Sequence, residues 1–73
     1  MPSDTFQLHG EFIELHVLLK LQGLAGSGGE AKALIAGGQV SVDGQPEIRK
    51  GRKLRGGEVV RLGDAEIRII ATA

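Results

Sequence analysis

The chain has 73 residues, no cysteine, and nine basic and nine acidic side chains. It therefore predicts one domain that a small aliphatic core stabilises without disulfides, with no room for a catalytic domain beside a binding domain. No apolar run approaches the roughly 18 residues that a membrane span needs, and Asp4 stands where a signal peptide carries positive charge. We expect a soluble cytoplasmic protein, and a monomer.

The first segment is predicted to contain one short strand. Residues 1–4 are expected to form a loose tail. Apolar and polar side chains alternate from Thr5 to His9, which is typical of a strand, and Gly10 ends it.

The segment from Glu11 to Leu24 carries two competing patterns. Its apolar residues alternate with polar ones as in a strand, whereas Leu15 and the leucines three and four positions later are spaced as on one face of a helix. We favour a helix over residues 15–22, because Gly23 can then serve as its C-terminal stop.

The second helix has clearer ends. Ser27 followed by Glu30 is the capping-box pattern, in which each side chain binds a free amide at the helix start. Residues 30–36 are mostly strong helix formers. Gly37-Gly38 ends the helix, with one of the two glycines in the left-handed conformation.

From residue 40 the period of the apolar pattern changes to two. Val40 and Val42 face one way, and Asp43-Gly44 is the dipeptide typical of a type I′ hairpin turn. Pro46 lies in the returning arm and lacks an amide donor, so that arm should be short or lie at the edge of a sheet.

Two more strands are predicted over residues 58–62 and 65–70, with glycine-containing turns before and between them. A strand, two helices and these antiparallel strands together predict an α+β domain. In it, two short helices pack on a small antiparallel sheet.

The segment Arg49–Arg55, hereafter the basic segment, holds five of the nine basic side chains and no acid. The neutral total therefore hides about +5 here and about −5 elsewhere. Like charges this close repel one another unless a polyanion lies over them. A hairpin before the segment and a strand after it would fix the charges in space. The alternative is a solvated turn that happens to be basic.

Residues 27–44, with the sequence SGGEAKALIAGGQVSVDG, resemble the core of the S4 RNA-binding domain. The pattern of that core is a Ser-started helix followed by Gly-x-Val-x-Val-Asn/Asp-Gly. The continuation through Glu47–Lys50, Lys53–Arg55 and Gly57–Val60 is similar too. Upstream, Leu18-Leu19-Lys20-x-x-Gly23 is similar to the first helix of the small stand-alone bacterial S4-like proteins. The resemblance covers residues 12–62.

The resemblance implies a non-catalytic surface that binds structured RNA, such as rRNA or tRNA, in association with the ribosome. By position it implies the following contact residues: Lys20 on the first helix; Gly28, Gly29 and Lys32 on the second; and Arg49, Lys50, Arg52, Lys53 and Arg55 in the basic segment. Many S4 domains carry Arg directly after the Ser, where this chain has Gly28. This departure shifts the expected contacts toward the basic segment, although the amides of a helix start still favour a phosphate.

The expected chemistry is the neutralisation of phosphates. Arg can bind a phosphate bidentately and Lys acts as a point charge, and the counterions released make binding depend on salt. A loop around Gly51 would bring the cations to one side. We expect that replacing Arg49, Arg52 and Lys53 with Glu abolishes RNA binding without unfolding the domain.

Aromatic residues are scarce, because Phe6 and Phe12 are the only two. We expect both in the core or on a strand face, which leaves no exposed ring on which RNA bases could stack.

Other functions have weaker support. Residues 26–31 fit the dinucleotide-binding pattern G-x-G-x-x-A with residues 17–24 as the preceding strand, but hairpins follow instead of further βαβ units. His9, Glu11 and His16 lack a metal-ligand spacing, and no serine has an evident activating base. We therefore expect no metal, cofactor, small-molecule substrate or enzymatic activity. A protein-binding adaptor that uses the same charged surface is the serious alternative.

Overall fold

The computed structural model describes residues 3–71 and confirms the α+β class. In chain order its elements are β1 (Ser3–Gln7), β2 (Ile13–Glu14), α1 (Leu15–Leu21), α2 (Gly28–Ala36), β3 (Val40–Val42), β4 (Gln45–Pro46), β5 (Lys53–Leu54), β6 (Val59–Leu62) and β7 (Ala65–Ile70). Neither described helix is long and apolar enough to cross a membrane.

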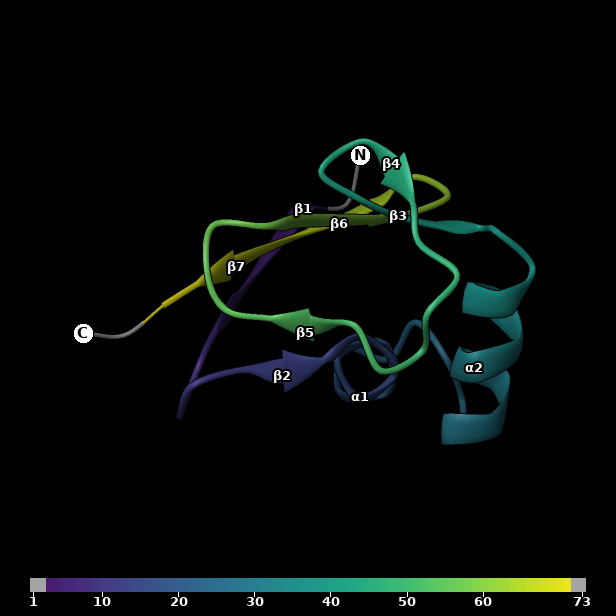
Figure 1. Ribbon diagram of the computed structural model, residues 1–73, viewed down its shortest axis with the longest axis horizontal. Coiled ribbons are helices and arrows are strands. Elements are labelled where there is room, and N and C mark those ends of the chain that lie inside the picture. Colours follow the sequence, from purple (N-terminus) through teal and green to yellow (C-terminus); the bar gives the residue numbers. More distant parts are fainter. Residues whose placement is uncertain (1–2, 72–73) are drawn as a thin grey trace.

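The elements form two layers around one core. Five strands make a sheet in the order β1-β7-β6-β3-β4, and β2 pairs with β5 in a separate two-stranded sheet. Figure 1 shows the larger sheet above, the β2–β5 pair and α1 beneath it, and α2 at one side. The core between them consists of Leu8, Leu15, Leu18, Leu19, Ala25, Ala31, Ile35, Val40, Val42, Leu54, Val60, Ile67 and Ile69.

The larger sheet is mixed, whereas the sequence predicted a purely antiparallel one. β1 runs parallel to β7, with Phe6 opposite Ile69, and the other neighbouring strands are antiparallel. A parallel pair needs a long crossover, which the helices and hairpins between the two strands supply. β1 begins at Ser3 and ends at Gln7, so residues 3 and 4 belong to the strand and not to the expected tail. Residues 1 and 2 lie outside the described residues.

Both helices end at a glycine in the left-handed conformation, as predicted. After α1, the N–H of Gly23 (φ 75°) donates to the carbonyl of Lys20 at 3.1 Å, and the N–H of Leu24 donates to that of Leu19 at 3.0 Å. Gly38 (φ 76°) has the same role after α2. This pattern is the Schellman motif, which pairs the last free carbonyls of a helix.

The β3–β4 hairpin also has the predicted turn. Asp43 and Gly44 both have positive φ, 52° and 84°, as a type I′ turn requires. β4 is the edge strand of the larger sheet, so the missing amide of Pro46 leaves no ladder bond unmade.

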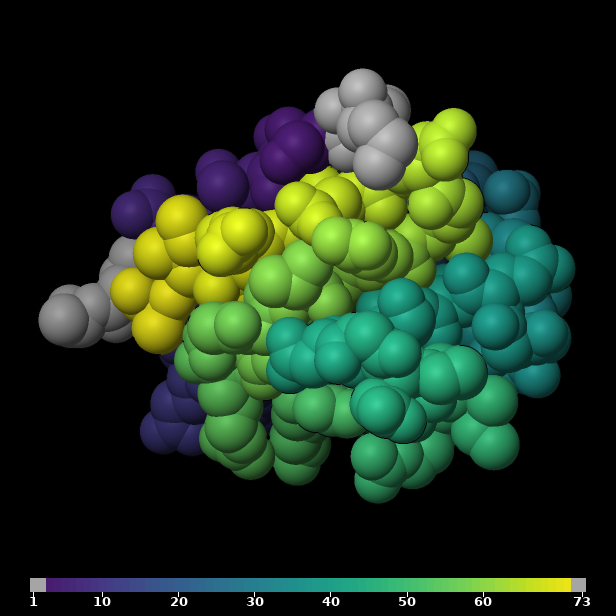
Figure 2. Space-filling view, turned by 90° about the horizontal axis from the view of Figure 1, so that it is seen from above, coloured from purple at the N-terminus to yellow at the C-terminus, as the bar shows by residue number. Residues whose placement is uncertain are grey.

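Neither helix covers the outer face of the larger sheet. Figure 2 shows β7 (yellow) at this surface between β1 (purple) and β6 (green). Since Val60 and Ile67 point into the core, their neighbours Arg61 and Arg68 lie on the outer face, and both are exposed. Arg61 pairs there with Glu66, with 2.7 Å between Nη2 and Oε1.

The turn that leads into β6 contains two glycines, Gly56 and Gly57, that should differ in how much a side chain would destabilise the fold. It has φ 123°, and a Cβ atom there would lie 2.6 Å from the Cβ of Ala71, whereas Gly57 has φ 90° and open space around it. We predict that Gly57→Ala lowers the free energy of unfolding by about 1–2 kcal/mol through backbone strain alone. Gly56→Ala should lower it by about 1–3 kcal/mol more because of the clash. Urea unfolding of the two variants measures this difference, and equal losses would contradict it.

Candidate functional site

The basic segment begins with a tight turn. The N–H of Arg52 donates to the carbonyl of Arg49 at 3.2 Å, which closes Arg49-Lys50-Gly51-Arg52 into a four-residue turn. The two arginines are thereby brought near each other at the ends of the turn. The expected loop around Gly51 is present.

The first turn of α1 anchors this loop through the backbone. The N–H of Leu15 donates to the carbonyl of Arg52 at 2.9 Å, and the N–H of His16 donates to that of Lys50 at 3.2 Å. Nδ1 of His16 lies 2.9 Å from the same Lys50 oxygen. The first amides of a helix have no partner within the helix, so the loop supplies acceptors that these amides need. The basic segment is therefore fixed to the helix layer.

The carboxylate of Glu47 binds both arginines of the turn. Its Oε2 accepts from the backbone N–H and Nε of Arg49 at 3.0 and 3.1 Å, and its Oε1 accepts from Nη2 of Arg49 at 3.1 Å and Nη1 of Arg52 at 2.7 Å. Glu47 is only 6% exposed, and burial alone would disfavour its charge. The hydrogen bonds from Arg49, and then the one from Arg52, prevail and lower the pKa of Glu47 to about 2.

Two of the five basic side chains are thus paired with a carboxylate, whereas the sequence predicted an unpaired run. Arg49 still has a side chain that is 73% exposed, and that of Arg52 is 32% exposed. Each guanidinium has five N–H donors and keeps some of them for a further anion. A Glu in place of Arg49 or Arg52 would place a second carboxylate next to the buried Glu47, and the two would repel each other. The structure therefore gives no reason to expect that the variant with Glu at positions 49, 52 and 53 stays folded.

Glu47 was not among the residues predicted for the site. The available signal was a single acid two residues before the first arginine of the basic segment. Glu47 and Arg49 share a face in an extended chain, but Glu47 can reach Arg52 only if the chain turns. The turn at Gly51 depends on contacts with α1, so the sequence pattern alone did not reveal this pairing.

β5 positions two further basic side chains of the segment. Leu54 is buried and pairs with Ile13 of β2, so Lys53 and Arg55 lie on the opposite, outer face of the two-stranded sheet. Phe12 lies with them: Nζ of Lys53 is 4.9 Å and Cζ of Arg55 is 5.7 Å from the centre of its ring. The β2–β5 pair was not predicted from the sequence.

The two phenylalanines have different environments. Phe6 is half-buried and packs against the core, as expected. Phe12 is 40% exposed, so the expectation that no ring is exposed is wrong for this residue.

Lys50, Lys53 and Arg55 form no ion pair with a carboxylate within residues 3–71. Glu58 is close in sequence, but its carboxylate accepts from the backbone amides of Arg55 and Gly56 at 2.9 and 2.7 Å. No direct ion pair neutralises these three cations within the described residues, and Glu14 lies opposite Lys53 in the β2–β5 ladder.

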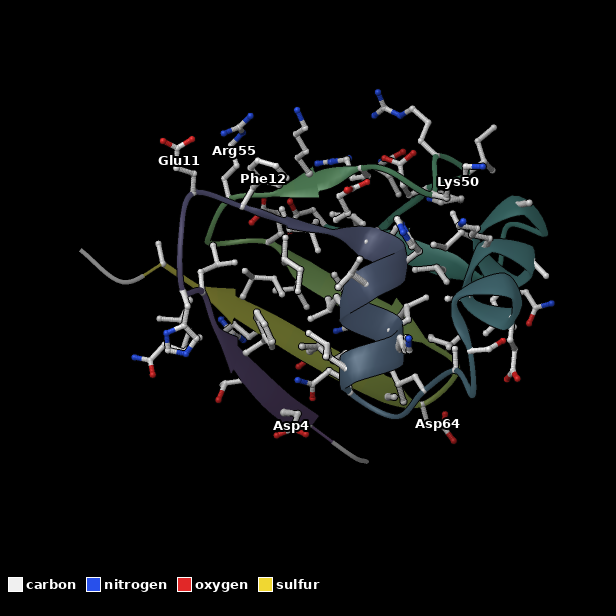
Figure 3. The ribbon with its side chains drawn as sticks, turned by 90° about the horizontal axis from the view of Figure 1, so that it is seen from below. Asp4, Glu11, Phe12, Lys50, Arg55 and Asp64 are labelled. Carbon is white, nitrogen blue, oxygen red and sulfur yellow. The ribbon has the colours of Figure 1, made fainter. Side chains whose placement is uncertain are left out.

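Acids lie both beside the basic segment and on the opposite side of the molecule. Figure 3 shows Arg55 and Lys50 projecting from one side, and Asp4 and Asp64 on the opposite side. Glu11 lies beside Arg55 in this view, without an ion pair between them. Glu14 also lies on the side of the basic segment, because it is opposite Lys53 in the β2–β5 ladder.

Lys20 and Lys32, the two helix lysines predicted for the site, differ in how they relate to this segment. Lys20 follows His16 by four residues on α1, which places it one turn further on the same side of the helix. Because His16 contacts the loop carbonyl of Lys50, Lys20 lies on the side of α1 that faces the basic segment. Lys32 is exposed on α2, and no described contact joins it to the segment.

Gly28 and Gly29 form the start of α2. Ser27 caps this start, because its Oγ accepts from the N–H of Glu30 at 3.1 Å. A Cβ atom at Gly28 would meet nothing within 4 Å, and one at Gly29 would meet only the Ser27 hydroxyl at 3.9 Å. The fold therefore does not require glycine at either position, and their role as contacts stays a prediction.

Two of the rival functions can be compared with the structure. The dinucleotide-binding pattern needs a strand over residues 17–24, but this segment is most of α1 and the turn after it. Within residues 3–71, no three His, Asp or Glu side chains are grouped so that they could hold a metal ion. A shallow hollow of about 190 Å³ lies between β1, β7 and the turn after α1. Asp4 is part of its lining, on the side opposite the basic segment.

Comparisons with known proteins agree with this geometry. The model of the S4 domain family matches residues 6–70. The "Putative RNA-binding protein YbcJ" of Escherichia coli (strain K12) is 44% identical over 59 residues, which cover 81% of this chain and 84% of YbcJ. The "Probable ribosome maturation protein RlbA" of Bacillus subtilis (strain 168) is 42% identical over 60 residues, which cover 82% of this chain and 84% of RlbA.

A solved structure is similar as well. The solution structure of YbcJ from Escherichia coli, described as revealing an αL motif involved in RNA binding, superimposes with a TM-score of 0.71 and 43% sequence identity. The superposition covers 92% of this chain and 86% of that one.

The low pKa of Glu47 leads to a prediction about stability and pH. A pKa lowered from 4.5 to about 2 stabilises the fold at pH values above 4.5, and this stabilisation is lost as the pH falls toward 2. We predict that Glu47→Gln lowers the free energy of unfolding at pH 7, and that the difference from wild type shrinks between pH 4.5 and 2. Denaturant unfolding at several pH values measures it. Glu66→Gln, at an exposed pair, is the control and should have little effect. A difference for Glu47→Gln that stays constant across this range would contradict the prediction.

Proposed function

Because the chain belongs to the S4 domain family, we propose that it binds structured RNA and that the basic segment contacts the phosphates. Two of its relatives support this proposal by name, since one is called an RNA-binding protein and the other a ribosome maturation protein. The proposed role is binding alone, with no catalytic step.

The observation that carries the proposal is that the backbone of the basic segment is held by contacts with both layers of the fold. Glu47 ties Arg49 and Arg52 to each other, and the backbone bonds from α1 hold the loop between them. β5 then continues the segment as a strand. Cations whose spacing is fixed before binding lose little conformational freedom when they meet phosphates of matching spacing. An RNA with its own fixed shape provides such phosphates.

The proposed contacts divide into two kinds. Lys50, Lys53 and Arg55 are the cations without a carboxylate partner among the described residues, and they act as the main phosphate contacts. The arginines bound to Glu47 offer their remaining N–H groups as oriented donors. Such contacts fix the position of an RNA but carry little information about its sequence. We therefore propose recognition of shape, with weak sequence preference.

Ribosomal RNA is the proposed partner. It is the structured RNA that a ribosome maturation protein would meet, and the relative with this name covers most of the present chain. Lys20, on the side of α1 that faces the basic segment, would extend the contact surface along the helix.

Salt dependence tests the proposed surface. The slope of log K against log salt is negative, and each lost phosphate contact makes it less steep by about 1. We predict that Lys50→Ala/Lys53→Ala weakens binding to a ribosomal RNA hairpin and makes that slope less steep by about 2. Fluorescence anisotropy titrations at several salt concentrations measure both quantities.

Arg61→Ala/Arg68→Ala is the matched control, because it removes the same charge from the outer face of the larger sheet. It should leave the slope unchanged. Equal effects of the two double variants would show non-specific attraction and would contradict the proposed surface. A complex from cell extract that survives nuclease treatment would favour the protein-binding adaptor instead.

Association with ribosomal particles tests the proposed partner. We predict that the protein sediments with ribosomal particles in sucrose gradients at low salt, and that high salt or ribonuclease releases it, because its contacts are mainly with phosphates. Immunoblots of gradient fractions measure this. Lys50→Ala/Lys53→Ala should move to the top of the gradient, whereas Arg61→Ala/Arg68→Ala should not. A protein that stays at the top under all conditions would argue against rRNA as the partner.

A further inference from the structure

We infer that Phe12, Lys53 and Arg55 form a binding site for one unpaired nucleotide, in which the base stacks on the Phe12 ring. This inference rests on the proposed function, because the nucleotide would belong to the RNA that the basic segment holds. It adds a second kind of recognition to the phosphate contacts.

The two-stranded sheet places these three side chains on one surface. Ile13 of β2 lies opposite Leu54 of β5, so Phe12 falls opposite Arg55 when the same antiparallel register is extended by one residue. Side chains alternate along a strand, and Leu54 is buried, which directs its two neighbours to the outer face. Figure 3 shows Phe12 beside Arg55 at the outer edge of the molecule.

The surroundings of Phe12 are unusual for a ring that serves only the core. It is not part of the core cluster or of the apolar side chains packed against it, and 40% of the residue is exposed. Its ring neighbours include two cations, at 4.9 Å for Lys53 and 5.7 Å for Arg55. An exposed cation–ring contact is a modest attraction, so a ligand that offers stacking and negative charge together can displace or share it.

A nucleotide has both of these properties. Its base presents a flat π surface to the ring, and the planar guanidinium of Arg55 can stack on a base as well. The phosphates on either side of the base carry the negative charge that Lys53 and Arg55 attract. Every base has such a surface, so this site would select an unpaired nucleotide over a paired one without selecting its identity.

The site also continues the proposed phosphate surface. Arg52 closes the basic turn, and the chain runs directly from it into β5. Three residues of extended chain, about 10 Å, separate Arg52 from Arg55. A strand that leaves a duplex lying on the basic turn can therefore reach Phe12 with its first unpaired nucleotides.

Two RNAs that differ by one nucleotide test the inference. One is a blunt duplex, and the other is the same duplex with a single unpaired 2-aminopurine, a fluorescent base whose emission changes when it stacks. The wild-type protein should bind the second RNA more tightly and change its emission. Phe12→Leu should lose affinity for the second RNA by about 5- to 150-fold, which is the usual effect of removing a stacking ring, and with it the preference over the blunt duplex.

Two further variants make the result specific. Phe12→Tyr keeps the ring and should retain the preference and the emission change. Phe6→Leu removes the other ring of the chain, which packs against the core, and should also retain both. Circular dichroism of each variant shows whether it is folded. If Phe12→Leu does not fold, a photocrosslink from 4-thiouridine at the unpaired position of the wild-type complex decides, and it should map to Phe12.

The outcomes separate this inference from the proposed function. Equal affinity for the two RNAs, an unchanged emission or a crosslink far from Phe12 overturns the nucleotide site and leaves duplex binding intact. Binding of neither RNA overturns the proposed function and the nucleotide site with it.

Discussion

Five like charges in seven residues repel one another, and the buried carboxylate of Glu47 offsets part of that repulsion. A buried carboxylate is unfavourable unless it is well paired. Here both oxygens of Glu47 are used, because together they accept four hydrogen bonds from Arg49 and Arg52. The N–H of Glu47 donates to the carbonyl of Val40 at 2.9 Å, so the larger sheet holds the residue in place. The position of the basic turn therefore depends on the edge of this sheet.

The same turn is fixed from the other layer by the free amides of α1. Leu15 and His16 must find acceptors outside the helix, and the carbonyls of Arg52 and Lys50 are those acceptors. The turn is thus held through a side chain by the sheet and through its backbone by the helix. Either attachment alone would leave it free to pivot. With both, the backbone of the turn and the guanidinium groups of Arg49 and Arg52 have defined positions.

The acids of the chain do not all lie against the basic segment. Several are used to hold the fold and do not neutralise the basic segment. Asp43 Oδ1 accepts from the N–H of Val59 at 3.0 Å, and Glu58 accepts from the two amides at the start of the turn into β6. Asp4 and Asp64 lie on the side opposite Arg55. The net charge of this protein is therefore a poor indicator of its partner, and the distribution of charge over its surface is a better one.

The sequence by itself determined the features that depend on neighbouring residues. The Asp43-Gly44 turn, the Ser27 cap and the glycine ends of both helices follow from local backbone preferences, which act wherever the chain folds. The basic segment and the resemblance to the S4 domain could also be recognised from the amino-acid sequence alone. The tertiary structure decided what depends on residues far apart in the chain. The parallel pairing of β1 with β7, the β2–β5 pair and the exposure of Phe12 all require segments that meet only after folding. The pairing of Glu47 with Arg52 spans only five residues, yet it needs the turn that α1 holds from more than thirty positions away. Local preferences fix the turns and the helix ends, whereas the burial of the core fixes which segments meet and so decides short strands such as β2 and β5.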